Sequence, residues 1–72
     1  MGCINPDGTL APSAKTVLEF LKSPKTSVEV AQHTGMPMYR VRMSLRELSE
    51  AGLLSETDGL YQITEAGLTR LS

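Results

Sequence analysis

The sequence predicts a mainly α-helical fold with one small β-hairpin, arranged as a winged helix-turn-helix: a three-helix bundle, a wing and a short C-terminal helix. Three observations predict it. Apolar residues recur at helical spacing in three successive segments, a short glycine-containing turn separates the second segment from the third, and an Asp-Gly pair lies between two strand-like runs. The chain has 72 residues, so we expect a single small domain over residues 1–72.

Residues 1–11 are predicted to form an irregular lead-in, because Asn5-Pro6-Asp7-Gly8 is a strong turn signal. The first helix then begins at Pro12, since the missing N–H of proline has no cost at the first helical position. Its buried stripe follows the spacing i, i+3, i+4, i+7 and consists of Ala14, Val17, Leu18 and Leu21. Ser23-Pro24 marks the end of this helix.

The second helix is short and is predicted to be capped by Ser27, whose hydroxyl can accept a hydrogen bond from an unpaired backbone N–H. Val28 and Ala31 supply its buried side, with Val30 as a further candidate. Gly35 ends the helix, because glycine adopts the left-handed conformation without strain. A third helix that starts only two residues later must cross the second one steeply, which is the geometry of a helix-turn-helix.

The third helix is predicted over residues 37–51, with Pro37 at its first position and Gly52 as its stop signal. One side of this helix is apolar and forms a core seam of Met38, Val41, Leu45 and Leu48. The opposite side repeats the helical spacing with Tyr39, Arg42, Met43 and Arg46, and Arg40 lies on its flank. The helix therefore has one face for the core and one cationic face for solvent.

A β-hairpin is predicted from two strand-like runs, residues 53–57 and 60–64, that flank Asp58-Gly59. Asp-Gly is a preferred pair for a two-residue type I′ turn, in which both residues have positive φ. Thr64 then caps a last short helix over residues 65–71. The apolar side of this helix consists of Ala66, Leu68 and Leu71.

Charge is distributed unevenly along the chain, although the net charge is only −1. Between Lys15 and Arg46 there are six basic residues and two acidic ones, whereas from Glu47 onward there are five acidic residues and one basic one. Such a chain can present one cationic face despite an acidic total. The alternative is that these charges are simply scattered over a solvated surface.

Two arginines of the third helix are placed unfavourably with respect to the helix dipole. Acidic residues stabilise a helix N-terminus, yet Arg40 and Arg42 lie near it, and Arg42 with Arg46 forms a like-charge i, i+4 pair. An anionic partner would remove this penalty. A helix fits the major groove of DNA, where arginine can bond guanine or phosphate, tyrosine can reach phosphate and methionine can touch a thymine methyl group. The alternative is an ordinary wet surface on which Arg46 pairs with Glu50.

Three stretches resemble the winged helix-turn-helix domains of MarR-like and ArsR-like transcriptional regulators. They are residues 26–35 (TSVEVAQHTG), the run 48–54 with its Leu-x-x-x-Gly-Leu-Leu pattern, and residues 61–67 (YQITEAG). The resemblance implies a DNA-recognition surface of Met38, Tyr39, Arg40, Arg42, Met43 and Arg46. It also implies that Asp58-Gly59 is the tip of the wing.

We therefore expect a small DNA-binding transcriptional regulator with double-stranded DNA as its partner. Lys25, together with Lys15 and Lys22, is a candidate for contacts to the DNA backbone. The alternative is a protein–protein interaction module or accessory subunit without direct DNA binding, with a protein partner or a homodimer. The acidic wing residues Glu56 and Asp58 favour this alternative, because carboxylates repel phosphates.

Catalysis, metal binding and cofactors have no support in the sequence. A single cysteine, Cys3, and a single histidine, His33, cannot assemble a structural zinc site. We interpret His33 as a surface or turn-packing residue, since no acidic residue or cysteine lies at a spacing that would build a site with it. No apolar run approaches the roughly 18 residues that cross a bilayer. We therefore expect a cytoplasmic protein that is neither an enzyme nor membrane-bound.

Overall fold

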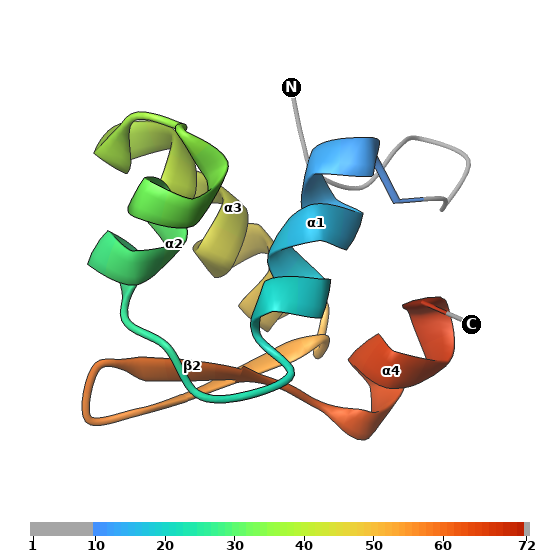
Figure 1. The fold of residues 1–72 in the computed structure, drawn as a ribbon. Coiled ribbons are helices and arrows are strands. Elements are labelled where there is room, and N and C mark those ends of the chain that lie inside the picture. Colours follow the sequence, from blue (N-terminus) through green and yellow to red (C-terminus); the bar gives the residue numbers. More distant parts are fainter. Residues whose placement is uncertain (1–9, 72) are drawn as a thin grey trace.

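The computed structural model describes residues 10–71 and shows a winged-helix fold of four helices and an antiparallel hairpin (Figure 1). The elements are α1 (Pro12–Phe20), α2 (Ser27–Thr34), α3 (Met38–Glu50), β1 (Leu54–Thr57), β2 (Leu60–Ile63) and α4 (Glu65–Leu71). Their order and type are those predicted. The predicted turn at residues 5–8 and Cys3 lie outside the described residues.

The helices α1, α2 and α3 pack around one core, with the hairpin below them and α4 beside α1 (Figure 1). The core comprises Leu10, Ala14, Val17, Leu18, Leu21, Val30, Val41, Leu45, Leu48, Leu53, Leu54 and Ile63. Leu10 is only 6% exposed, although the sequence placed it in an irregular lead-in. The core therefore begins before the first helix.

The first helix follows the prediction closely. Pro12 occupies its start, and all four residues of the predicted stripe are buried. The helix ends at Phe20, a little before the predicted stop at Ser23-Pro24. The N–H of Leu21 still donates to the carbonyl of Val17 at 3.0 Å, so the last turn closes before the chain leaves for α2.

The start of α2 differs from the prediction, because Thr26 and not Ser27 is the N-cap. The backbone N–H of Glu29 donates to Thr26 Oγ1 at 3.2 Å, and the N–H of Thr26 donates to the Glu29 carboxylate at 2.8 Å. This reciprocal capping box requires a glutamate three residues after the cap, which Thr26 has and Ser27 lacks. Ser27 is consequently the first helical residue.

The buried side of α2 also differs from the prediction. Val30 is the buried residue of this helix and Ala31 is half-buried, whereas Val28 is 53% exposed. With 3.6 residues per turn, two residues correspond to just over half a turn, so the valines at positions 28 and 30 lie on opposite sides of the helix and only one can face the core. The prediction of Val28 as a core residue was wrong.

The turn of the helix-turn-helix is built by Thr34, Gly35 and Pro37. Gly35 has φ of 75°, as its predicted role at the end of α2 requires. The Thr34 hydroxyl donates to the carbonyl of Val30 at 2.8 Å and accepts from the N–H of Met36 at 3.3 Å, which holds the turn against the end of α2. Pro37 caps α3 instead of starting it, so α3 begins at Met38 and ends at Glu50, one residue inside each predicted bound.

The end of α3 positions the wing. The N–H of Leu53 donates to the carbonyl of Leu48 at 2.9 Å and that of Gly52 to Ser49 at 3.0 Å, while Gly52 adopts φ of 81°. This is a Schellman motif, and its characteristic apolar contact is provided by Leu48 and Leu53, which are both buried. The chain therefore leaves α3 in a fixed direction and enters β1.

The hairpin has the predicted two-residue turn, with φ of 53° at Asp58 and 82° at Gly59. Thr57 pairs with Leu60 next to the turn. The sequence did not predict that the other edge of β2 would also be paired. There, Lys25 and Tyr61 exchange two backbone hydrogen bonds of 3.0 and 2.7 Å, so the segment between α1 and α2 adds a third, one-residue strand to the wing.

The cap of α4 is as predicted, but of its predicted apolar side only Leu71 packs against the core. Thr64 Oγ1 accepts from the N–H of Gly67 at 3.2 Å and donates to the carbonyl of Gly52 at 2.7 Å. The residue that α4 buries is Gly67, whereas Ala66 is exposed, Leu68 is 44% exposed and Leu71 is half-buried. The helix lies so close to the end of β2 that a side chain at position 67 would collide with its neighbours.

Candidate nucleic-acid interface

The outward face of α3 is the candidate interface, and α3 lies behind α2 in the view of Figure 1. Tyr39 is 67% exposed and Met43 is 51% exposed, so an aromatic and a thioether side chain stand in solvent. The three arginines beside them, Arg40, Arg42 and Arg46, are exposed as well. These five residues are named the α3 stripe below.

Met38 was predicted both in the core seam and on the recognition surface, and it belongs to the border between the two faces, outside the core cluster. It is half-buried, whereas Val41, Leu45 and Leu48 are fully buried and Ser44 completes the inward face. The inward residues fix the rotation of α3 about its own axis, because turning the helix would expose them. The predicted division of α3 into a core face and a cationic face is confirmed by this burial.

The N-terminus of α3 has no acidic residue in its first turn to balance the helix dipole, and the same is true of α1. The N-cap residue of α3 is Pro37. Among the described residues, 10–71, no side chain makes a capping hydrogen bond to this end, and the first turn contains Arg40 but no acidic residue. By contrast, α2 begins with a complete capping box that includes a glutamate. Because a helix N-terminus carries partial positive charge, Arg40 and Arg42 lie near an end of α3 that already attracts anions.

The C-terminal end of the stripe carries an ion pair. Arg46 Nε lies 3.3 Å from Glu50 Oε2, with side chains that are 80% and 68% exposed. The pairing that the sequence offered as an alternative to DNA binding is therefore present. An exposed pair of this kind adds at most about 1 kcal/mol to stability, so it does not explain why the arginine is there.

Lys25 lies apart from the α3 stripe, in the strand segment that pairs with Tyr61. The residue is half-buried, its Nζ donates to Ser23 Oγ at 3.2 Å, and the same atom lies 5.4 Å from the centroid of the Phe20 ring. The other ring partner of Phe20 is His33, stacked at 4.0 Å with an interplanar angle of 6°. The stacking of His33 on Phe20 thus joins α2 to α1. This contact between two helices was not predicted from the sequence.

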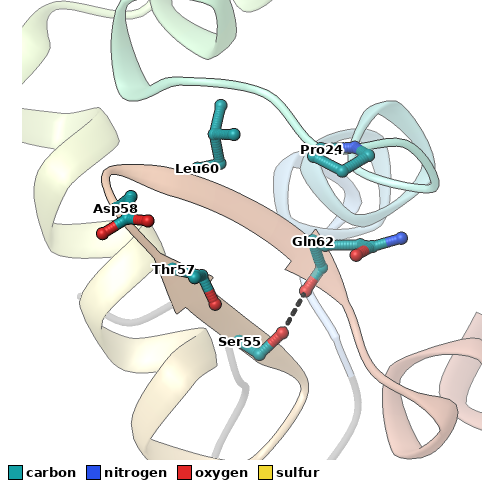
Figure 2. Close-up of a pocket in the computed structure, with 6 residues that line it drawn as sticks. All are labelled: Pro24, Ser55, Thr57, Asp58, Leu60 and Gln62. Atoms are coloured by element: carbon teal, nitrogen blue, oxygen red, sulfur yellow. Dashed lines mark hydrogen bonds between the residues drawn. The ribbon is translucent and has the colours of Figure 1, made fainter.

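The wing is acidic at its tip, and the hollow on its outer face is lined by apolar and polar side chains with one carboxylate, that of Asp58 (Figure 2). The Glu56 carboxylate accepts from the N–H of Gly59 at 2.6 Å and so stabilises the turn, while Asp58 forms the turn itself. The outer face is a shallow hollow lined by Pro24, Ser55, Thr57, Asp58, Leu60 and Gln62. No lysine or arginine from the described chain lines it, and Leu60 there is 42% exposed.

A protein-family model, described as FaeA-like protein, matches residues 14–59, from α1 to the turn of the hairpin. The chain belongs to the FaeA-like family. This is a family of winged-helix regulators, and the match includes the whole of α3. The fold of four helices and a hairpin is compatible with the resemblance to MarR-like and ArsR-like regulators. Searches of curated proteins and of solved structures find no match to this FaeA-like chain.

The helices described between residues 10 and 71 of this FaeA-like chain have at most 13 residues. In the part of the chain that the structure describes, none is long and apolar enough to cross a membrane.

Proposed function

We propose that this FaeA-like protein is a transcriptional regulator that binds double-stranded DNA in the cytoplasm by inserting α3 into the major groove. The observation that carries the proposal is the α3 stripe: three exposed arginines with Tyr39 and Met43, on a helix whose opposite face is locked into the core. The likeness of the sequence to MarR-like and ArsR-like motifs supports the same function. Binding, and not catalysis, is the activity that these residues serve.

The dimensions of α3 suit this role. It has 13 residues, which corresponds to a rod about 20 Å long and 10–12 Å across, and the major groove of B-DNA is about 12 Å wide. Arginine can bond guanine O6 and N7 with two parallel N–H groups or grip a phosphate. In this arrangement Tyr39 reaches phosphate and Met43 contacts a thymine methyl group. The stripe thus combines positioning contacts with base contacts.

The wing limits the extent of the interface. Glu56 and Asp58 occupy its tip, and carboxylates are repelled by the DNA backbone. Lys25 also has partners within the fold, in Ser23 and the Phe20 ring. We therefore expect DNA binding to depend on α3 and on few phosphate contacts, without a second anchor from the wing.

Salt dependence tests this proposal. In a fluorescence titration with random-sequence duplex DNA, the logarithm of the affinity should fall with the logarithm of the salt concentration with a slope of about −3, as expected for three or four neutralised phosphates. A slope near −10 would require many more phosphate contacts than α3 can make. Absence of any salt-sensitive binding at tens of micromolar protein in low salt would contradict the proposal.

A second candidate function is a protein-interaction module or accessory subunit, and the outer face of the wing favours it. That hollow offers an exposed leucine, Leu60, beside Pro24 and a single carboxylate, Asp58, with polar uncharged side chains between them (Figure 2). Such a surface suits a protein partner, or a second copy of the chain, better than a polyanion. A complex of this kind should survive charge reversal of Arg42 and Arg46, which separates the two functions.

A further inference from the structure

The ion pair at the end of the α3 stripe leaves part of the arginine available. Glu50 Oε2 contacts Arg46 through Nε, at 3.3 Å. A guanidinium has five N–H donors in a planar fork, and the contact with Nε occupies the side edge of that fork. The two terminal nitrogens, which make the bidentate contact with guanine, are not used by this bond.

We propose that Glu50 is a positioning residue for base recognition: it holds Arg46 by Nε so that the two terminal nitrogens point to one guanine. This inference rests on the proposed DNA-binding function. Glu50 itself contacts no base. Without Glu50, the flexible side chain of Arg46 would bind the nearest phosphate. With Glu50, the guanidinium group is held in an orientation that allows hydrogen bonds to a base.

Helix stability does not account for the pair. Glu50 lies in the last turn of α3, where the helix dipole favours basic residues, and that turn contains none. The order of the pair, with the arginine on the N-terminal side of the glutamate, is also the weaker one for an i, i+4 ion pair. The dipole therefore disfavours Glu50 at its position, and the order of the pair gives it little compensating stability.

A carboxylate beside a DNA-binding arginine also lowers affinity for any duplex, because it repels phosphates. Glu50 is 68% exposed on its side chain and extends the α3 stripe by one further turn. A residue that opposes general binding while orienting Arg46 is expected to raise selectivity at the expense of affinity. An ordinary surface acid would lower affinity without raising selectivity, so the two roles can be distinguished by experiment.

Two variants, Glu50→Ala and Glu50→Gln, test the inference. Glutamine keeps an oxygen that can accept from Arg46 Nε but removes the charge, whereas alanine removes both. Glu19→Ala is the matched control, because Glu19 is an exposed glutamate on α1, away from the α3 stripe. Each protein would be incubated with a pool of duplexes randomised over the central base pairs, and its bound fraction sequenced, beside a salt titration with random duplex.

Glu50→Ala is expected to bind random duplex more tightly, with a salt slope steeper by about one unit, and to lose about fivefold or more of the guanine preference at one position, which is the lower end of what one bidentate contact provides. Glu50→Gln should bind more tightly but keep most of that preference. Glu19→Ala should keep all of it. The Arg46 Nε–H resonance, observed without DNA, should shift in Glu50→Ala.

If Glu50→Ala retains the guanine preference of the wild type, the positioning role is overturned while DNA binding stands. If the wild-type protein shows no salt-sensitive binding at all, the proposed function fails first, and the Arg46 Nε–H resonance alone then reports whether Glu50 holds the arginine. A preference lost equally in Glu50→Gln and Glu50→Ala would show that the charge, and not the hydrogen bond to Nε, is what matters, which also overturns the inference.

Discussion

Replacing Gly67 with alanine is expected to destabilise the domain by about 1–3 kcal/mol, the usual cost of forcing an extra group into a packed site. An ideal Cβ at this position would lie 2.5 Å from Ile63 Cγ1 and 2.5 Å from the backbone carbonyl oxygen of Leu53. The side chain of Ile63 can move, but the carbonyl belongs to the segment that joins α3 to β1. The helix α4 must therefore shift. The expected loss of folding stability should be measured as a lower midpoint of urea or thermal unfolding.

Helix propensity acts in the opposite direction, because alanine is better than glycine in a helix by about 1 kcal/mol. Thr69→Ala on the same helix is the control, since Thr69 is exposed and its change should stay within about 0.5 kcal/mol. An unchanged or raised stability of Gly67→Ala would contradict the close packing of α4 against the end of β2.

Reversing the charge of both Arg42 and Arg46 to glutamate is expected to weaken DNA binding by about 30-fold or more, since each arginine contact contributes roughly 1–3 kcal/mol. Both side chains are exposed and neither contributes to the core, so the fold should be retained. Affinity for random duplex is the measurement, with the circular dichroism spectrum as the check on folding.

Lys15 on α1 and Lys22 just after it supply the comparison, because their double charge reversal changes the net charge by the same amount away from α3 and removes at most two candidate backbone contacts and no base contact. That variant should lose much less affinity than the arginine variant. Equal losses in the two variants would mean that total charge, and not the α3 stripe, determines binding.

The parts of the fold that the sequence predicts are those decided by local chemistry. Asp58-Gly59 and Gly52 both require positive φ, which few residue types adopt. The helical spacing in α3 correctly assigns Val41, Leu45 and Leu48 to the core, but it also assigns Met38, which is only half-buried. The N-cap of α2 was also locally encoded, in the spacing between Thr26 and Glu29. The neighbouring hydroxyl of Ser27 obscured it.

Contacts between distant segments were not predictable in this way. The pairing of Lys25 with Tyr61, the stacking of Phe20 on His33 and the burial of Gly67 each join residues from separate elements. Gly67 is the clearest case, because a glycine offers no apolar side chain and the sequence instead favoured Ala66, Leu68 and Leu71 as the inward side. Gly67 is buried because the backbone of α4 lies close to the segment between α3 and β1. The spacing of apolar residues in the sequence carries no information on such a contact.

The same distinction applies to the candidate interface. Periodicity and the absence of acids placed Tyr39, Arg42 and Arg46 on the solvent side of α3, and their exposure confirms that placement. Lys25 donates to Ser23 and lies over the Phe20 ring, and these contacts depend on the packing of α1 against the segment that pairs with β2. The charge of Lys25 alone could therefore not show whether its side chain is free to contact DNA.

Mapping backbone amide chemical shifts of the folded protein during titration with a short duplex tests the central claim most directly. We predict that the largest changes fall on α3 between Tyr39 and Arg46, with small changes at the wing tip. Changes confined to the outer face of the hairpin, or to α1 and α4, would contradict the claim that the guanidinium groups of α3 meet the DNA.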